Sequence, residues 1–324
     1  MVNVADIDII VPLFNEASGL KDFHHELFSE LTKLSRTWRI IYVNDGSRDA
    51  TQDILDELCS TDRRVAALRL SRNFGHQAAL TAGLDHADSN IVIMMDGDGQ
   101  HPPSLIHEML SLYEAGYQIV QTKRIDVTES SSFFKRVTAR MFYGLLSWLG
   151  DIELEAGAAD FRLVSREVWT AVRSIQEYHR FLRGIFAWVG FRMVILPYRP
   201  RHRKHGTTKY SLKHMLRLAG DGLFSFSLTP LRVALSCGAI LAGLAILEVL
   251  YIASFFLTGR QNVLVPGWSS LVLLLTICSS IEMFLLGIIG IYVGMIFQEV
   301  KRRPIYLLDQ TPQTGRQDKG TECF

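Results

Sequence analysis

Short apolar runs alternate with amphipathic stretches over the first 232 residues of the chain. Four runs have the length and composition of buried strands: IDIIVP (7–12), RIIYVN (39–44), VAALRL (65–70) and IVIMMD (91–96). Between the first two, apolar residues recur at helical spacing from Leu20 to Leu34. This alternation of strand and helix predicts an α/β fold with a parallel, doubly wound sheet covered by helices on both faces.

The pattern changes after Arg232, where residues 233–257 and 271–297 are almost uninterrupted apolar segments. A helix needs ~20 apolar residues to cross a bilayer, so the two segments predict a transmembrane hairpin. Basic residues lie at its outer ends, Arg232 before it and 301–303 after it, against the single Arg260 between the segments. This asymmetry predicts that both chain ends are cytoplasmic. A pair of buried core helices is the alternative interpretation.

The segments around the hairpin complete the predicted organisation. Residues 211–228 place apolar side chains on one helical face, which favours an interfacial helix on anionic headgroups over a core helix. Glu248 and Glu282 interrupt the spans, and each is either functional, or is protonated or packs within an oligomer interface. We expect a soluble domain at 1–207, followed by interfacial helices at 208–231. A transmembrane hairpin at 232–298 and a cytoplasmic tail at 299–324 would complete the chain.

Composition excludes several classes of protein. The 324 residues carry a net charge of +1, which gives no bias towards nucleic acid. The four cysteines are far apart and form no C-x-x-C pair, so neither a disulfide framework nor a zinc site is indicated, and a reducing compartment fits best. The N-terminus lacks the basic and long apolar regions of a secretory signal, so we expect the first domain to stay where it is made.

Polar clusters follow three of the predicted strands, at 12–16 (PLFNE), 44–51 (NDGSRDAT) and 96–101 (DGDGQH). Ligands of open α/β sheets bind beyond the carboxyl ends of the strands, so we expect these clusters to converge on one crevice. The D-x-D pair Asp96 and Asp98 offers hard oxygen ligands for Mg²⁺ or Mn²⁺, with a nucleotide diphosphate completing the coordination shell. A solvated turn is the alternative. No P-loop and no G-x-G-x-x-G occurs, which disfavours a P-loop ATPase and a Rossmann dehydrogenase.

Six motifs carry a resemblance to a known family: VPLFNE, VNDGSRDAT, SRNFGHQAALTAGLDHA, DGDGQHPP, ADFRL and RKHGTTKYS. In this order, and followed by two apolar spans, they resemble the polyisoprenyl-phosphate glycosyltransferases. That family has an inverting GT-A fold and includes bactoprenol glucosyltransferases and dolichol-phosphate mannose synthases. The similarity covers about residues 5 to 308. Asn44 departs from it, because many relatives have a second aspartate there, and the change affects expected contacts to the base or ribose.

The resemblance implies a role for each matching residue. The nucleotide sugar is expected to contact Pro12, Phe14, Asn15, Glu16, Asp45, Arg72, Asp96 and Gln100. The metal ligands are expected to be Asp96, Asp98 and Gln100, and the catalytic residues Asp98, Asp160 and Arg203. Asp160 in ADFRL is either a base or a sugar-positioning group. Pro12 could instead end its strand, and Arg72 could be a surface turn residue.

Basic residues are candidates for holding the acceptor phosphate: Arg124, Lys135, Arg136, Arg140 and Lys209. Arg136 and Arg140 share a helical face, and a solvated basic face is the alternative. Arg203 and Lys209 match the family pattern R-x-x-G-x-S-K, with Thr208 in place of serine. Membrane attraction alone would also account for this basic segment.

Together these features predict a membrane-anchored, metal-dependent transferase. It would move a hexose, preferably glucose from UDP-glucose, to polyprenyl phosphate with inversion, on the cytoplasmic face of the plasma membrane. The lipid-linked sugar would supply modification of a cell-surface glycan such as the O-antigen of lipopolysaccharide. A mannose synthase using GDP-mannose, another UDP-sugar donor and a non-catalytic scaffold are alternatives. A processive polysaccharide synthase should carry a Q-x-x-R-W motif, which is absent. The resemblance also implies a homo-oligomer, a tetramer.

Overall fold

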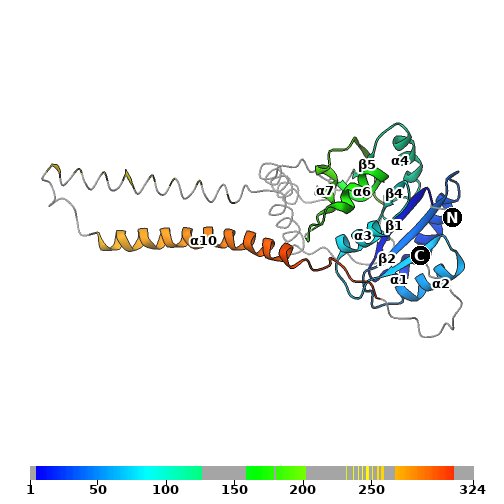
Figure 1. Cartoon of the computed structure of the whole chain (residues 1–324), viewed down its shortest axis with the longest axis horizontal. Helices are drawn as coiled ribbons and strands as arrows, with labels where there is room; N and C mark the ends of the chain where they lie inside the picture. Colours follow the sequence, from blue (N-terminus) through cyan, green and yellow to red (C-terminus); the bar gives the residue numbers. More distant parts are fainter. Residues whose placement is uncertain are drawn as a thin grey trace.

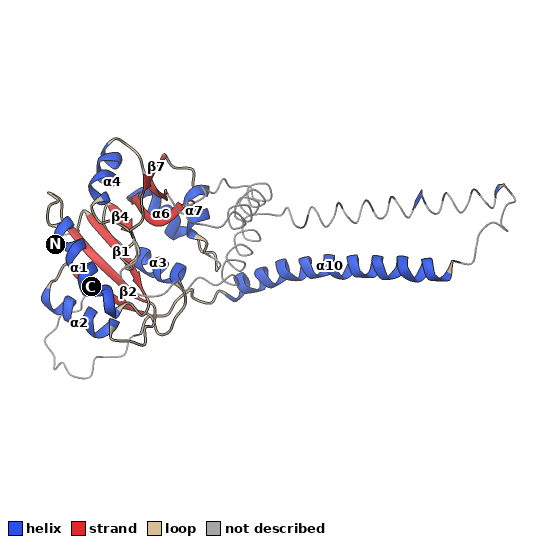
Figure 2. Cartoon of the chain, turned by 180° about the vertical axis from the view of Figure 1, so that it is seen from behind, coloured by secondary structure: helices blue, strands red, loops and turns tan. Residues whose placement is uncertain are grey.

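A computed structural model describes residues 5–125, 158–178, 180–201 and 267–309, with separate residues between 231 and 258. These residues form an α/β domain from which one long helix extends (Figure 1). The view from behind shows the same arrangement, with the strands enclosed by helices and the long helix projecting away from them (Figure 2).

The domain is built on a seven-stranded sheet with the order β3-β2-β1-β4-β6-β5-β7. The strands are β1 (Ile7–Leu13), β2 (Trp38–Asn44), β3 (Val65–Arg69), β4 (Ile91–Met94), β5 (Ile119–Arg124), β6 (Ala158–Ser165) and β7 (Met193–Tyr198). The four apolar runs expected to be strands are β1 to β4, so these predictions are confirmed. Because β1 pairs in parallel with both β2 and β4, their carboxyl ends meet at one edge.

The sheet is mixed, which corrects the expectation of a fully parallel one. Among the described strands, β6 alone runs in the opposite direction, antiparallel to both β4 and β5. In its sequence AADFRLVS, apolar residues alternate with Asp160 and Arg162. Because of these charged residues, the hydrophobic pattern does not indicate a strand that is buried on both faces. The reversal matters for the site because β6 begins at the edge where β4 and β5 end.

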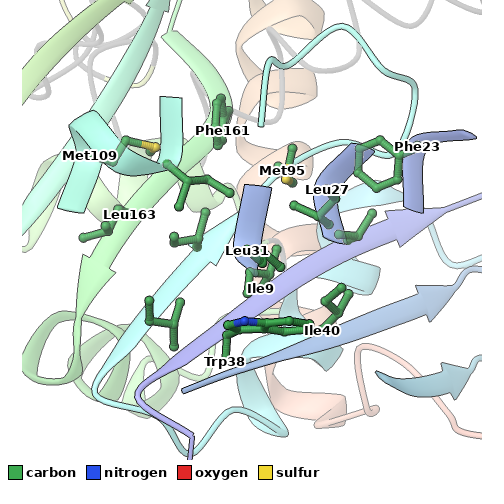
Figure 3. Packing of buried hydrophobic residues seen from close by; sticks show 14 of the residues in the cluster. Ile9, Phe23, Leu27, Leu31, Trp38, Ile40, Met95, Met109, Phe161 and Leu163 are labelled. Carbon is green, nitrogen blue, oxygen red and sulfur yellow. The ribbon is translucent and has the colours of Figure 1, made fainter. Parts of the chain in front are cut away.

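Strand alternation divides the apolar side chains between two cores, one on each face of the sheet. Ile9 belongs to the first core, with residues of α1 (Ala17–Leu31), α2 (Thr51–Thr61) and α4 (Leu105–Glu114). Figure 3 shows Ile9, Leu27 and Met109 in this cluster. Ile10 belongs to the second core, with α3 (His76–Asp85), α6 (Arg166–Ser174) and α7 (Leu182–Trp188). Helices therefore cover both faces, as the sequence predicts.

Pro12 does not end its strand, because β1 continues to Leu13 and Pro12 pairs with Val43 of β2. Pairing with β4 stops at Ile10, so β1 runs on alone on that side. A proline can occupy a strand where no ladder hydrogen bond needs its missing N–H, and the unpaired stretch of β1 provides such a place.

The helix that leaves the domain is α10 (Trp268–Lys301), which at 1.5 Å per residue is about 51 Å long. Within the described residues, one helical stretch, Ile277–Lys301, is long and apolar enough to cross a membrane, with a mean hydropathy of 2.0. It overlaps the second predicted span, and Glu282 is exposed on it. Most of the first span, including Glu248, and the predicted interfacial helix lie outside the described residues, so the hairpin stays a prediction.

Candidate active site

The loops after β1 and β2 are joined by hydrogen bonds. The Asn15 amide donates to Ser47 Oγ at 2.9 Å, and Asn15 Oδ1 accepts from the Arg48 amide at 2.8 Å. The Glu16 amide donates to Thr51 Oγ1 at 3.1 Å. The two polar clusters therefore meet beyond the carboxyl ends of their strands, as expected.

Asp45 connects these loops to a third one. The side chain is 3% exposed, and its two carboxylate oxygens accept from the amides of Phe74 and Gly75 at 2.7 and 2.9 Å. Burial raises the pKa of Asp45, and the two hydrogen bonds oppose that change. Asp45 thus holds the turn between β3 and α3 at the sheet edge, while its expected contact with a nucleoside stays a prediction.

The neighbouring residues explain why this turn can approach so closely. Gly46 has φ +64°, and a Cβ there would lie 2.4 Å from the backbone carbon of Arg72. Asn44 is buried, accepts from the Ser47 amide at 2.9 Å and donates to Gln52 Oε1 at 2.6 Å. An ionised aspartate at position 44 could only accept. Asn44 therefore shapes the loop from beneath, as an acceptor from the Ser47 amide and a donor to Gln52.

The D-x-D residues lie on the loop that follows β4. Gly97 brings this loop onto β1, because a Cβ there would lie 2.4 Å from Leu13 Cδ2. Asp98 Oδ1 accepts from the Gln100 amide at 3.0 Å, and the Gln100 carbonyl accepts from the Arg201 amide at 3.1 Å. Asp98 and Glu16 also line one small cleft together with Phe23. This loop therefore lies against both the first loop and the chain that follows β7.

The donor set suits a hard divalent cation. Asp96 Oδ1 is buried and accepts no hydrogen bond, although His76 Nε2 lies 3.4 Å away, and a buried carboxylate oxygen without a hydrogen bond is costly. No group of three or more His, Cys, Asp or Glu in metal-holding geometry occurs among the described residues. Mg²⁺ usually needs only one or two protein carboxylates besides phosphate oxygens and water, so Asp96 and Asp98 fit this kind of ion.

His101 supports the same loop from the core. It is fully buried, its Nδ1 lies 3.2 Å from the donating amide of Asp96, and its ring stacks on Phe161. Arg124 Nη2 lies 3.2 Å from His101 Nε2, and Arg124 Nε donates to the Tyr198 hydroxyl at 3.2 Å. Burial lowers the pKa of His101. Arg124 is thus brought to the site, behind the D-x-D loop.

Asp160 lies at the start of β6 with three cationic groups around it. Arg183 donates to both of its oxygens, from Nε at 2.9 Å and from Nη2 at 2.8 Å. Arg162 Nη2 donates at 2.9 Å, and His76 Nε2 lies 3.3 Å away. His76 Nε2 also lies 3.4 Å from Asp96 Oδ1, so one imidazole bridges the two carboxylates.

The charges in this cluster determine its protonation. Burial acts to raise the pKa of Asp160, but Arg183 and His76 outweigh it and hold that pKa well below its usual range. Burial likewise acts to lower the pKa of His76, but Asp96 and Asp160 outweigh it and raise the pKa to about 9. A general base works best with a pKa near the operating pH. The geometry therefore favours Asp160 as a positioning group over Asp160 as a base.

Comparison with known proteins identifies the family. Residues 8–171 match the family described as Glycosyl transferase family 2. The sequence is 34% identical over 308 residues to the bactoprenol glucosyl transferase of Shigella phage SfII, covering 94% of this chain and 98% of that protein. The chain belongs to glycosyl transferase family 2. It is therefore a glycosyltransferase.

Another relative matches over almost its whole length. The glycosyltransferase YkcC of Bacillus subtilis is 38% identical over 309 residues, which cover 94% of this chain and 93% of that protein. Among solved structures, glucosyl-3-phosphoglycerate synthase from Mycobacterium tuberculosis in complex with Mn²⁺, UDP and phosphoglyceric acid is 18% identical. It has a TM-score of 0.46 and covers 68% of this chain and 76% of that chain.

Several residues of this candidate site were not singled out from the sequence. His76 follows Gly75 in the motif SRNFGHQAALTAGLDHA. Its position at the start of a helix, after the turn that follows a strand, could have marked it as a candidate site residue. Arg183 lies in α7, 23 residues after Asp160, and nothing in the local pattern marks it. Arg162 belongs to ADFRL, and the motif did not indicate that its side chain would be 1% exposed and paired with Asp160.

The remaining expected residues of the family 2 site divide into two groups. Pro12 and Asn15 lie in or beside the joined loops, and Arg72 is exposed, with its guanidinium carbon 4.1 Å from the centroid of the Phe74 ring. Phe14 and Gln100 are half-buried at the same sheet edge. The other candidates lie outside the described residues: Lys135, Arg136, Arg140, Arg203 and Lys209.

Proposed function

We propose that this glycosyltransferase moves a hexose, preferably glucose from UDP-glucose, to polyprenyl phosphate with inversion. The observation that carries the proposal is the D-x-D loop beside the Asp160 cluster, in a domain whose chain includes a membrane-length apolar helix. In this proposal the domain would hold a metal-dependent donor site next to a bilayer. Similarity to bactoprenol glucosyl transferases over almost the whole chain supports the choice of sugar and lipid.

Binding of the nucleotide-sugar donor is assigned to the loops that follow β1, β2, β3 and β4. Asp96, Asp98 and Gln100 would hold Mg²⁺ or Mn²⁺ with the diphosphate of the nucleotide sugar. When bound, the cation offsets the negative charge that develops on the departing nucleotide diphosphate. Pro12, Phe14, Asn15, Glu16 and Asp45 would shape the nucleoside pocket. Arg72 would reach the donor from the turn that follows β3.

The acceptor needs little activation. A phosphate monoester has a second pKa near ~6, as in phosphoserine, so a lipid phosphate is largely ionised at pH 7 and can attack without a base. Asp160, fixed by Arg183, would then orient the sugar. A direct displacement by the phosphate oxygen inverts the anomeric centre.

Arg203 is assigned to charge stabilisation in the transition state. The Arg201 amide donates to the Gln100 carbonyl. Arg203 follows two positions later, outside the described residues, and its assignment rests on its match to the family pattern R-x-x-G-x-S-K. Lys209 follows on the same basic segment, and it would hold the acceptor phosphate with Arg124, Lys135, Arg136 and Arg140.

The membrane part follows from the same proposal. The catalytic domain and both termini would be cytoplasmic, with two spans in the plasma membrane and interfacial helices between domain and spans. A tetramer is the proposed assembly. The product of the reaction would be lipid-linked glucose, which would supply the modification of a cell-surface glycan.

Purified protein incubated with labelled nucleotide sugars and polyprenyl phosphate tests the proposal. We expect label from UDP-glucose in the lipid fraction, and none after EDTA treatment. Label from GDP-mannose instead would assign the chain to the mannose synthases. No lipid-linked product with any nucleotide sugar would contradict the transferase role.

A further inference from the structure

The chain turns back onto the catalytic domain after the membrane-length helix. Arg302, with φ +46°, ends α10, and residues 302–309 then run along the end of β3. We name residues 302–309 the C-terminal strap. Leu308 forms an antiparallel bridge with Leu70, the Ser71 amide donates to the Leu307 carbonyl at 2.8 Å, and the Asp309 amide donates to the Arg69 carbonyl at 2.8 Å.

This contact lies directly beside the donor loops. β3 is the outer strand of the sheet, so its free edge can accept another strand. On the opposite side, the Leu70 amide donates to the Asn44 carbonyl at 2.9 Å. Leu70 is therefore held between the strap and β2. Four residues after Leu70 begins the stretch Phe74 to His76. The amides of Phe74 and Gly75 bind Asp45, and the His76 imidazole reaches Asp96 and Asp160.

Side chains strengthen the strap. Tyr306 packs, with Leu308, against the second core and donates its hydroxyl to Asp85 Oδ2 in α3 at 3.2 Å. Burial, with the neighbouring Asp85, raises the pKa of Tyr306, so the hydroxyl keeps its proton at neutral pH. Asp309 Oδ2 lies 3.2 Å from Arg69 Nε, in a partly exposed ion pair.

A second contact fixes the end of α10 to the other side of the site. Glu299 Oε1 accepts from the Tyr178 amide at 2.8 Å. The chain from Tyr178 leads to Leu182, whose amide donates to Gln77 Oε1 at 3.1 Å, and then to Arg183. The last turn of the helix is thus connected to the start of α3 and to the arginine that holds Asp160.

We propose that the strap is a positioning element for the nucleotide-sugar site, with Tyr306 as its principal positioning residue. It holds the Ser71–Gly75 turn against β2, so that Asp45, Arg72 and His76 are in place before the donor binds. A loop ordered in advance lowers the entropy lost on binding. The proposal rests on the proposed function for the identity of the donor, but the contact itself can be tested without turnover.

Two truncations of the full-length protein form a matched pair. One removes 304–324 and therefore the strap residues that bind β3, and the other removes only 310–324. Both retain α10 and Arg303. With UDP-glucose as donor, we expect the shorter protein to lose about 10-fold to 100-fold in kcat/KM, mainly through a higher donor KM, while staying in the membrane fraction. Removal of 310–324 should leave both constants unchanged.

Amide hydrogen exchange separates this proposal from the proposed function. In the shorter protein, protection should fall at Ser71, Phe74 and Gly75 and persist at the central strand residue Ile40. This result would hold whatever the donor is. Protection lost at Ser71 but kept at Phe74 and Gly75 would overturn the proposal, because the strap would then only cover a strand edge.

Tyr306→Phe is a milder variant that keeps the aromatic packing and removes the bond to Asp85. We expect a severalfold rise in donor KM with kcat almost unchanged, and the same change in Asp85→Ala, which removes the acceptor, if that contact transmits the effect. Unchanged KM in both variants, or loss of protection throughout the domain, would show that the strap contributes to folding alone and would contradict a positioning role.

Discussion

Arg183 holds the Asp160 carboxylate through two parallel hydrogen bonds, one from Nε at 2.9 Å and one from Nη2 at 2.8 Å. Asp160 is 4% exposed, and buried carboxylates persist as ions only where cations compensate their charge. With Arg162 and His76 also in contact, the pair explains how an ionised group is kept beside the D-x-D loop. The Arg183 guanidinium also holds the pKa of Asp160 well below its usual range, against the effect of burial.

Arg183→Lys should lower kcat/KM by about 10-fold to 100-fold, because lysine keeps the charge but cannot make the bidentate contact that fixes the carboxylate. The melting temperature should change little, since Arg162 and His76 still compensate Asp160. Steady-state kinetics and thermal unfolding measure the two effects. Arg166→Lys is the matched control, because Arg166 pairs with the exposed Asp88 and surface pairs contribute little. Equal activity in both variants would contradict a role for Arg183.

Asp98→Asn should reduce turnover by about 10²-fold to 10³-fold or more, as loss of a charge-stabilising contact does. Folding should be preserved, because asparagine keeps the Oδ1 that accepts from the Gln100 amide. Activity is measured over a range of Mg²⁺ and Mn²⁺ concentrations. Asp22→Asn, which alters another carboxylate of the same cleft, should keep normal metal dependence. Full activity of Asp98→Asn, or of the parent protein in EDTA, would exclude a metal at this site.

Gly46→Ala should impair both stability and donor affinity. The alanine would need φ +64°, and its Cβ would meet the Arg72 backbone at 2.4 Å, which forces the second loop away from the turn that Asp45 binds. Left-handed backbone alone costs roughly 1–2 kcal/mol, so the total should exceed that range. Gly116→Ala has similar strain, at φ +92°, with no contact shorter than 3.5 Å, and lies away from the site. Chemical denaturation measures the free energy of unfolding of the two variants, and UDP titration measures their donor affinity. Equal effects of the two variants would argue against close packing at Gly46.

The proposed topology predicts cytoplasmic tags at both Met1 and Phe324. In a cysteine-free background, a cysteine at Asn262 should react with a membrane-impermeant thiol reagent added to intact cells, because the linker between the spans would be outside. A cysteine at the exposed domain residue Ser60 should react only after the cells are opened. Labelling of both positions, or of neither, in intact cells would remove one span from the proposal.

Much of the architecture follows from local pattern. The runs that became β1 to β4 are apolar on both faces, so burial between two layers of helices was readable from the sequence. The polar clusters could be assigned to one edge because parallel strands end together. β6 was missed because Asp160 and Arg162 interrupt its apolar pattern, and their pairing with each other exists only after the strand has been inserted between β4 and β5.

The sequence by itself determined the α/β class, the membrane-length helix, the D-x-D loop and the family, since each depends on residue type and spacing along the chain. Only the tertiary structure decided the surroundings of these groups. Arg183 reaches Asp160 across 23 positions and Tyr306 reaches Asp85 across 221, and such contacts leave no periodic signal because their partners meet only once the sheet is assembled. The charge state of Asp160 and the return of the chain to β3 both depend on these long-range contacts.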